Sequence, residues 1–103
     1  MSVIVEFSMF PTDVGESKSV YVSRIIKMIA DSGFNYKLTP MSTIVEADKL
    51  SDILSLIENA YNQLEPDCNR VYSVIKMDIR KGDENLFDKK IKSVENKIEE
   101  VKK

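Results

Sequence analysis

The sequence predicts an α+β fold in one domain that spans residues 1–103. Four stretches rich in β-branched and aromatic residues alternate with two amphipathic helical stretches, in the order β-α-β-β-α-β. Glycine, proline or a short polar loop separates most neighbouring stretches. This order is that of the ferredoxin-like split βαβ arrangement, a sandwich of one sheet and two helices. A further helical stretch after the last strand predicts an added C-terminal helix.

The four strands are predicted over residues 2–10, 34–38, 41–47 and 70–80, and Pro11 is expected to end the first. Alternation of side chains gives each strand two distinct faces. The faces expected to meet the helices carry Val3, Val5, Phe7 and Met9 in the first strand, and Val71, Ser73, Ile75, Met77 and Ile79 in the last.

The first helix is predicted to follow an N-cap at Ser17 and to end at Gly33, which suits the left-handed position after a helix. Its apolar stripe consists of Val22, Ile25, Ile26 and Ile29. Asp48 is predicted to cap the second helix, and Pro66 prevents that helix from continuing. The inner stripe of the second helix is predicted to be Leu50, Ile53, Leu54, Ile57, Tyr61 and Leu64. The C-terminal helix has an a/d seam of Phe87, Ile91, Val94, Ile98 and Val101.

Right-handed crossovers place both internal helices on one face of the sheet and predict the strand order 4-1-3-2. The open face should then carry Ile4, Phe10, Ile44, Tyr72 and Val74, beside the polar residues Glu6, Ser8, Lys76 and Asp78. So much apolar surface indicates a partner. Either a half-polar pocket lies at a subunit interface, or the face is a homodimer contact with cross-strand ion pairs. The pattern alone favours the homodimer contact.

The composition excludes several kinds of chemistry. The chain has no histidine, so it can form neither a Ser-His nor a Cys-His pair and has no histidine metal ligand. A net charge of −2 argues against a nucleic-acid partner, and no apolar run is long enough to suggest a membrane span. Cys68 is the only cysteine and is expected in a turn without a functional role. The single thiol fits a cytoplasmic protein.

Six short motifs stand in a fixed order along the chain. They are the strand ending at Pro11, residues 17–22, residues 32–33 with 36–38, residues 40–43 with Glu46, residues 70–71 with 75–80, and residues 93–97. Together these motifs resemble the small thiamine-binding protein family. The resemblance covers nearly the whole chain. Two positions depart from the family pattern: Ser42 stands where the family often has glycine, and residues 12–15 replace a glycine-rich turn.

The resemblance implies a ferredoxin-like fold, a homotetramer built as a dimer of dimers, and no catalytic activity. It implies binding of thiamine or its hydroxymethylpyrimidine moiety as a ligand, with no other cofactor. The expected ligand-binding residues are Ser8, Tyr21, Met41, Thr43, Glu46 and Lys76. Residues 43 and 46 point to opposite faces of a regular strand. Both can therefore reach one ligand only if the strand bulges or if the site crosses a subunit interface.

The alternative to a thiamine-binding protein is a structural or regulatory interaction module that forms homo-oligomers without a thiamine ligand. Its sequence features are the apolar open face and the seam of the C-terminal helix. A small enzyme is a third possibility, which the absence of histidine disfavours.

Overall fold

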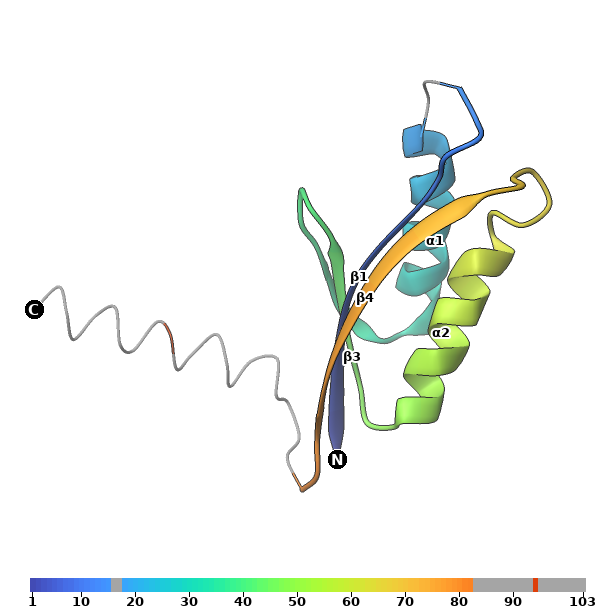
Figure 1. The fold of residues 1–103 in the computed structure, drawn as a ribbon. Helices are drawn as coiled ribbons and strands as arrows, with labels where there is room; N and C mark the ends of the chain where they lie inside the picture. Colours follow the sequence, from blue (N-terminus) through green and yellow to red (C-terminus); the bar gives the residue numbers. More distant parts are fainter. Residues whose placement is uncertain (16–17, 83–93, 95–103) are drawn as a thin grey trace, which may run out of the picture.

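The computed structural model describes residues 1–15, 18–82 and 94. Its elements are β1 (Ser2–Pro11), α1 (Lys18–Ser32), β2 (Asn35–Leu38), β3 (Thr43–Ala47), α2 (Leu50–Asn62) and β4 (Val71–Arg80). The two helices lie on the same side of the sheet, as Figure 1 shows. The described part is therefore an α+β sandwich in the predicted order. The predicted C-terminal helix over residues 87–101 lies outside the described residues, apart from Val94.

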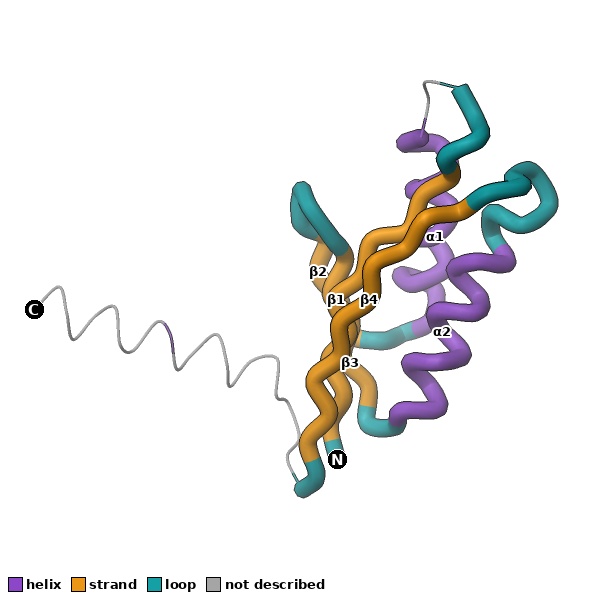
Figure 2. Tube along the Cα trace, viewed as in Figure 1, coloured by secondary structure: helices purple, strands orange, loops and turns teal. Residues whose placement is uncertain are grey.

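The sheet has the strand order β2-β3-β1-β4, which confirms the predicted order 4-1-3-2. All three strand pairs are antiparallel. β1 and β4 pair over their full length, from Ser2 opposite Arg80 to Pro11 opposite Val71, and run side by side in Figure 2. β3 pairs with β1 over five residues only, from Ala47 opposite Val3 to Thr43 opposite Phe7. β1 therefore continues past the end of β3.

The core lies between the helices and the strands β1 and β3. Val3, Val5 and Phe7 of β1 and Val45 of β3 are at most 2% exposed, because they face the helices. The residues that meet them from the helices and the following turn are Ile25, Ile29, Ile53, Leu56, Ala60 and Leu64. Gly33 ends α1 with a φ of +82°, which confirms the predicted left-handed position.

Several predicted details of α2 are wrong. The N-cap is Lys49 rather than Asp48, and Lys49 makes no side-chain capping hydrogen bond. Leu54 and Tyr61 are 52% and 42% exposed, although they were expected in the inner stripe. The buried stripe contains Leu56 and Ala60 instead. The buried face of α2 therefore includes Ala60, at 0% exposed, and excludes Leu54 and Tyr61.

Element ends also differ in the strands and the loop before β4. β1 includes Pro11, and β3 begins at Thr43 rather than at Met41, which lies in the turn. Cys68 lies in the connection from α2 to β4, as expected, but its side chain is 7% exposed and joins the core. Burial raises the pKa of the Cys68 thiol. The predicted cap at Ser17 lies outside the described residues.

β4 lies at the edge of the sheet and is poorly covered. Both helices pack over β1, and between them they reach β2 and β3 as well. On the helix side of β4, Ile75, Met77 and Ile79 are 40%, 37% and 47% exposed. On the open side, Tyr72 and Val74 are 55% and 43% exposed, which confirms them as surface residues. β4 therefore presents apolar side chains to solvent on both faces.

Candidate functional site

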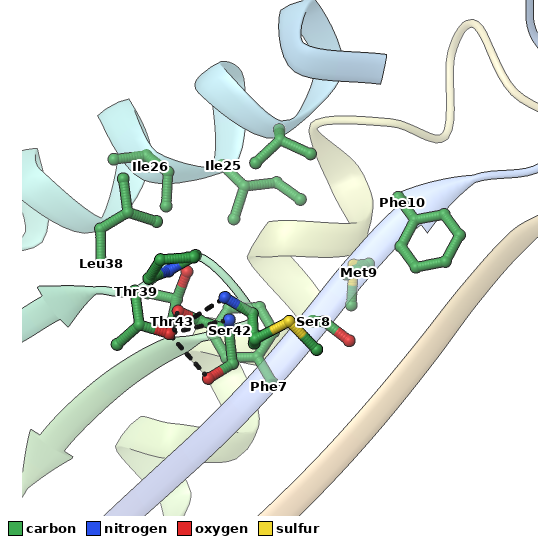
Figure 3. A pocket seen from close by; sticks show the side chains of 13 residues that line it. Phe7, Ser8, Met9, Phe10, Ile25, Ile26, Leu38, Thr39, Ser42 and Thr43 are labelled. Carbon is green, nitrogen blue, oxygen red and sulfur yellow. Dashed lines mark hydrogen bonds between the residues drawn. The ribbon is translucent and has the colours of Figure 1, made fainter.

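The candidate site is a cavity of about 430 Å³ between α1, the end of β1 and the β2–β3 hairpin. Its walls are mostly apolar and come from three elements. They consist of Phe7, Ser8, Met9 and Phe10 of β1, Val22, Ile25 and Ile26 of α1, and Leu38, Thr39, Pro40, Met41, Ser42 and Thr43 of the hairpin. Figure 3 shows the isoleucines of α1 on one side and the hairpin residues on the other. This volume falls within the range of about 300–1,000 Å³ that is usual for small-molecule sites.

The cavity exists because β1 is longer than its neighbour β3. The main-chain N–H of Thr12 donates to the carbonyl oxygen of Arg70 at 3.0 Å, which extends the pairing of β1 with β4. In an antiparallel sheet the main-chain groups of alternate residues bond to opposite neighbours. Because Thr12 bonds to the chain next to β4, the even-numbered residues of β1 bond to β4. The main-chain groups of the odd-numbered residues of β1 therefore point towards β3. Phe7 is the last residue paired with β3. The main-chain N–H and C=O of Met9 therefore point to the cavity side, without a strand partner among the described residues.

The turn from Thr39 to Ser42 forms the outer rim and is held by its own hydroxyl groups. The Thr39 hydroxyl donates to the Ser42 carbonyl oxygen at 2.8 Å. It also accepts from the main-chain N–H groups of Ser42 and Met41, at 3.0 and 3.3 Å. The Ser42 hydroxyl donates to Oε2 of Glu6 at 3.2 Å, which ties the turn to β1. Ser42 therefore fixes the rim of the cavity, an effect that a glycine at this position could not produce.

Thr43 is the polar residue most enclosed within this wall. It is 6% exposed and lies opposite Phe7 on the helix side of β3. No hydrogen bond from its hydroxyl group is found among the described residues. A nearly buried hydroxyl is stable without a protein partner when water or a ligand can bond to it. Thr43 Oγ1 is thus available as a donor or an acceptor inside the cavity.

Three of the six predicted ligand-binding residues line this cavity, namely Ser8, Met41 and Thr43. Met41 is 86% exposed and stands at the mouth. The other three do not line it. Tyr21 packs against the core, with the Arg24 guanidinium 5.0 Å from its ring centre. Glu46 and Lys76 lie on the open face of the sheet, where their strand partners include Ile4 and Glu6 respectively.

The regular register of β3 explains why Thr43 and Glu46 are separated. Each residue from Thr43 to Ala47 has one partner on β1, so the strand contains no bulge in this range. Thr43, Val45 and Ala47 are buried towards the helices, while Ile44 and Glu46 face the open side. Thr43 and Glu46 of one protomer therefore cannot contact the same small ligand.

Two contributions to the site carry no signal in the sequence pattern. The main-chain groups of Met9 are exposed only because β3 ends early, and any residue type except proline would provide them. Ile25 and Ile26 read as ordinary members of an apolar helical stripe, yet they form one wall. The tie between Ser42 and Glu6 could have been suspected only from Ser42 standing in place of glycine.

The charged groups of the described residues lie outside the cavity walls, which are entirely uncharged. Among the residues described, no group of three or more histidine, cysteine, aspartate or glutamate side chains could hold a metal ion. The lowered pKa of Asp13 arises chiefly from the hydrogen bond that the main-chain N–H of Asn69 donates to it, at 2.7 Å. That bond joins two loops. The chemistry available in the cavity is therefore hydrogen bonding and apolar contact.

Within the described part of the chain, neither helix has the length and apolar character needed to cross a membrane.

Known proteins of similar size resemble the chain over most of its length. A UPF0045 protein of Mycobacterium bovis is 33% identical over 95 residues, which cover 92% of this chain and 93% of the relative. A UPF0045 protein of Methanocaldococcus jannaschii is 33% identical over 92 residues, which cover 89% and 91%.

Solved structures agree with the fold. A hypothetical protein of Methanocaldococcus jannaschii superposes with a TM-score of 0.80 at 32% identity, covering 90% of this chain and 95% of that protein. A Thermotoga maritima protein named for thiamine biosynthesis or salvage gives a TM-score of 0.77 at 22% identity, covering 90% and 99%. At that identity the second likeness shows the fold alone. The family model described as "Thiamine-binding protein" matches residues 5–95, so the chain belongs to the thiamine-binding protein family.

Proposed function

We propose that this protein binds thiamine or its hydroxymethylpyrimidine moiety in the cavity beside β1, without catalysing a reaction on it. The observation that carries the proposal is an uncharged cavity in which the N–H and C=O of Met9 lie on the edge next to Thr43. Membership of the thiamine-binding protein family supports the same ligand class. The protein works, in this proposal, as a cytoplasmic homotetramer built from dimers and needs no further cofactor.

An aminopyrimidine matches the main chain of an unpaired strand residue. Its exocyclic amino group donates a hydrogen bond, and the neighbouring ring nitrogen accepts one. In an extended strand the N–H and C=O of one residue point to the same side. The C=O of Met9 would accept from the amino group, and the N–H of Met9 would donate to the ring nitrogen. The Thr43 hydroxyl would then bond to a further polar atom of the ring.

The cavity walls suit the flat face of the pyrimidine. Ile25 and Ile26 of α1 lie on one side, and Met41 at the mouth offers a polarisable thioether. No carboxylate lines the cavity, and Glu6 is the acidic residue tied to its rim through Ser42. The thiazolium cation of thiamine would therefore sit at the mouth rather than inside. This placement predicts that the pyrimidine supplies most of the binding free energy.

Calorimetric titration with thiamine, hydroxymethylpyrimidine and thiamine phosphates tests the proposal. We expect hydroxymethylpyrimidine to bind within about tenfold of thiamine, because both present the same edge to Met9. An analogue in which hydrogen replaces the amino group should bind about tenfold more weakly, for the loss of about 1–3 kcal/mol when a buried acceptor stays unpaired. Well-folded protein that gives no heat with any of these ligands would contradict the proposal.

A second candidate function is favoured by the exposed apolar residues of β4. Ile75, Met77 and Ile79 are surface residues on the same side as the helices, and the cavity plays no part in this surface. A homo-oligomeric interaction module without a thiamine ligand would use such a surface. Assembly without any ligand binding in the titration above would favour this second function.

A further inference from the structure

A second hollow, of about 440 Å³, adjoins the candidate cavity between α1 and the end of β2. Val22, Ile26 and Leu38 line both hollows, so these side chains form the boundary between them. Ile26 and Leu38 are seen next to each other at this boundary in Figure 3. The remaining walls of the second hollow come from α1 alone and consist of Ser19, Ser23, Lys27 and Ala30. A ligand that extends beyond the cavity can therefore continue into the second hollow.

The boundary between the two hollows is apolar and open to solvent. Leu38 is 60% exposed, although it is a large apolar residue in a strand. Its neighbour Lys37 points to the open side of the sheet, opposite Ile44, and leaves this boundary uncharged. A ligand that crosses Leu38 would remove its apolar surface from water, which favours binding.

Lys27 is the charged residue of the second hollow and has no partner of its own. The other cations of α1 are engaged: Lys18 lies 5.0 Å from the centre of the Phe10 ring, and Arg24 forms an ion pair with Asp67. Within the described part of the chain, Lys27 makes neither an ion pair nor a hydrogen bond. Its ammonium group is therefore free to bind an anion in the second hollow.

We propose that the second hollow binds the phosphate group of a phosphate ester of thiamine, and that Lys27 recognises this group. The inference rests on the proposed function and names the form of its ligand. The pyrimidine occupies the cavity and the thiazolium ring lies at the mouth, as above. The phosphorylated arm of the thiazolium ring then crosses Leu38 towards Lys27.

The hydroxyl groups of this hollow contribute less than Lys27. Ser23 lies one helical turn before Lys27, but its hydroxyl already donates to the carbonyl oxygen of Val20 at 2.7 Å. Lys27 must therefore supply the main polar contact with the phosphate. Because ion pairs at exposed sites are weak, we expect a thiamine phosphate to bind about threefold to fivefold more tightly than thiamine. This preference should shrink as the salt concentration rises.

Substitution of Lys27 tests the recognition of the phosphate. Calorimetric titration of the full chain compares thiamine with thiamine monophosphate and thiamine diphosphate. Lys27→Gln should remove the threefold to fivefold preference for the phosphate esters and leave the affinity for thiamine unchanged. Lys37→Gln is the matched control, because it removes a lysine next to Leu38 that lies on the other side of the sheet. The preference should persist in this control.

Substitution of Ala30 tests whether the hollow itself is used. Ala30 lines the second hollow and does not line the cavity. Ala30→Leu fills part of the hollow with a residue that favours helix, so α1 should stay intact. The affinity for thiamine monophosphate should fall at least threefold, while hydroxymethylpyrimidine should bind as before.

The outcomes separate this inference from the proposed function. Equal affinities of the wild-type protein for thiamine and its phosphates would overturn the phosphate site and leave thiamine binding in place. A preference that survives in Lys27→Gln would also overturn it. A changed molar mass of Ala30→Leu in light scattering, with the preference intact, would make the hollow a contact between copies of the chain. The absence of heat with every ligand would overturn both proposals.

Discussion

β1 and β4 are neighbouring ten-residue strands with similar alternation, yet their helix-facing residues have different surroundings. Val3, Val5, Phe7 and Met9 of β1 are 0–7% exposed. The partners of the first three on β4, which are Ile79, Met77 and Ile75, are 37–47% exposed although they lie on the same face. α1 and α2 reach β1 and its neighbours on one side but leave the edge strand bare. Burial is therefore decided by where the helices lie over the sheet, and the alternation pattern indicates only which face can be buried.

The first prediction compares two residues that pair directly, Val5 on β1 and Met77 on β4. Val5→Ala removes two buried methyl groups and leaves a cavity, so the free energy of unfolding should fall by about 2–3 kcal/mol. Met77→Ala should cost less than about 1 kcal/mol in dilute protein, because the side chain is already partly solvated. Chemical denaturation measures both.

Repeating the denaturation of the Val5→Ala and Met77→Ala variants at several protein concentrations tests whether a second copy covers β4. If β4 is covered by a second copy, the cost of Met77→Ala should grow as the protein concentration rises, since the dimer is then lost as well. The cost of Val5→Ala should stay constant, because no partner is needed to bury Val5. Equal costs for the two variants in dilute protein would show that β4 is covered within the protomer.

The second prediction compares the two faces of β3. Thr43→Val keeps the shape of the side chain and removes its hydroxyl group, so affinity for hydroxymethylpyrimidine should fall about tenfold. Glu46→Gln should change the affinity less than twofold, because Glu46 lies on the open face. Calorimetry on both variants separates a site within one protomer from a site shared between subunits. A tenfold loss in Glu46→Gln would favour the shared site.

The third prediction concerns Cys68, which lies in a connection yet belongs to the covered part of the molecule. Cys68→Ser should leave ligand binding and assembly unchanged, because the residue contributes to neither the cavity walls nor β4. It should lower the free energy of unfolding by about 1 kcal/mol, since a hydroxyl is harder to bury than a thiol. A thermal melt measures this cost, and an unchanged melting temperature would show that Cys68 is solvated.

The fourth and smallest effect is expected at Asp13, an exposed carboxylate that joins two loops. Its pKa is lowered from 3.8 by the hydrogen bond from the N–H of Asn69. A carboxyl group with a lowered folded-state pKa stabilises the fold above its unfolded pKa and loses this contribution as the pH falls through the folded value. Asp13→Ala should therefore lower the melting temperature slightly at pH 7. Below the folded pKa of Asp13 the difference from wild type should disappear.

Much of the fold could be predicted from sequence because it depends on local patterns. Alternation marked the strands, helical periodicity marked α1 and α2, and the handedness of crossovers gave the strand order. The buried face of α2 was predicted only in part, because Ala60 gives a weak apolar signal beside Leu54 and Tyr61. The exposure of the helix-facing side chains of β4 could not be predicted either, because it depends on where the helices lie over the sheet.

The predicted residues that line the candidate site are Ser8 of β1 and Met41 and Thr43 of the hairpin. Thr43 and Met41 stood out as a hydroxyl and a thioether near Pro40, and both line the cavity. The role of Met9 could not be read from the sequence, because it belongs to the main chain. These main-chain groups are free of β3 because β3 begins at Thr43. The predicted strand began two residues earlier, at Met41, and would have covered Met9.

The unequal lengths of β1 and β3 have an evolutionary consequence. If the ligand is recognised by the N–H and C=O of Met9, then substitution of that residue leaves the recognising atoms in place, with proline as the exception. Drift in side chains would reshape the walls while the recognised edge stays the same. An insertion that extends β3 along β1 would instead pair these two main-chain groups and remove them from the cavity. Members of such a family can thus diverge widely in sequence and still inherit the same ligand preference.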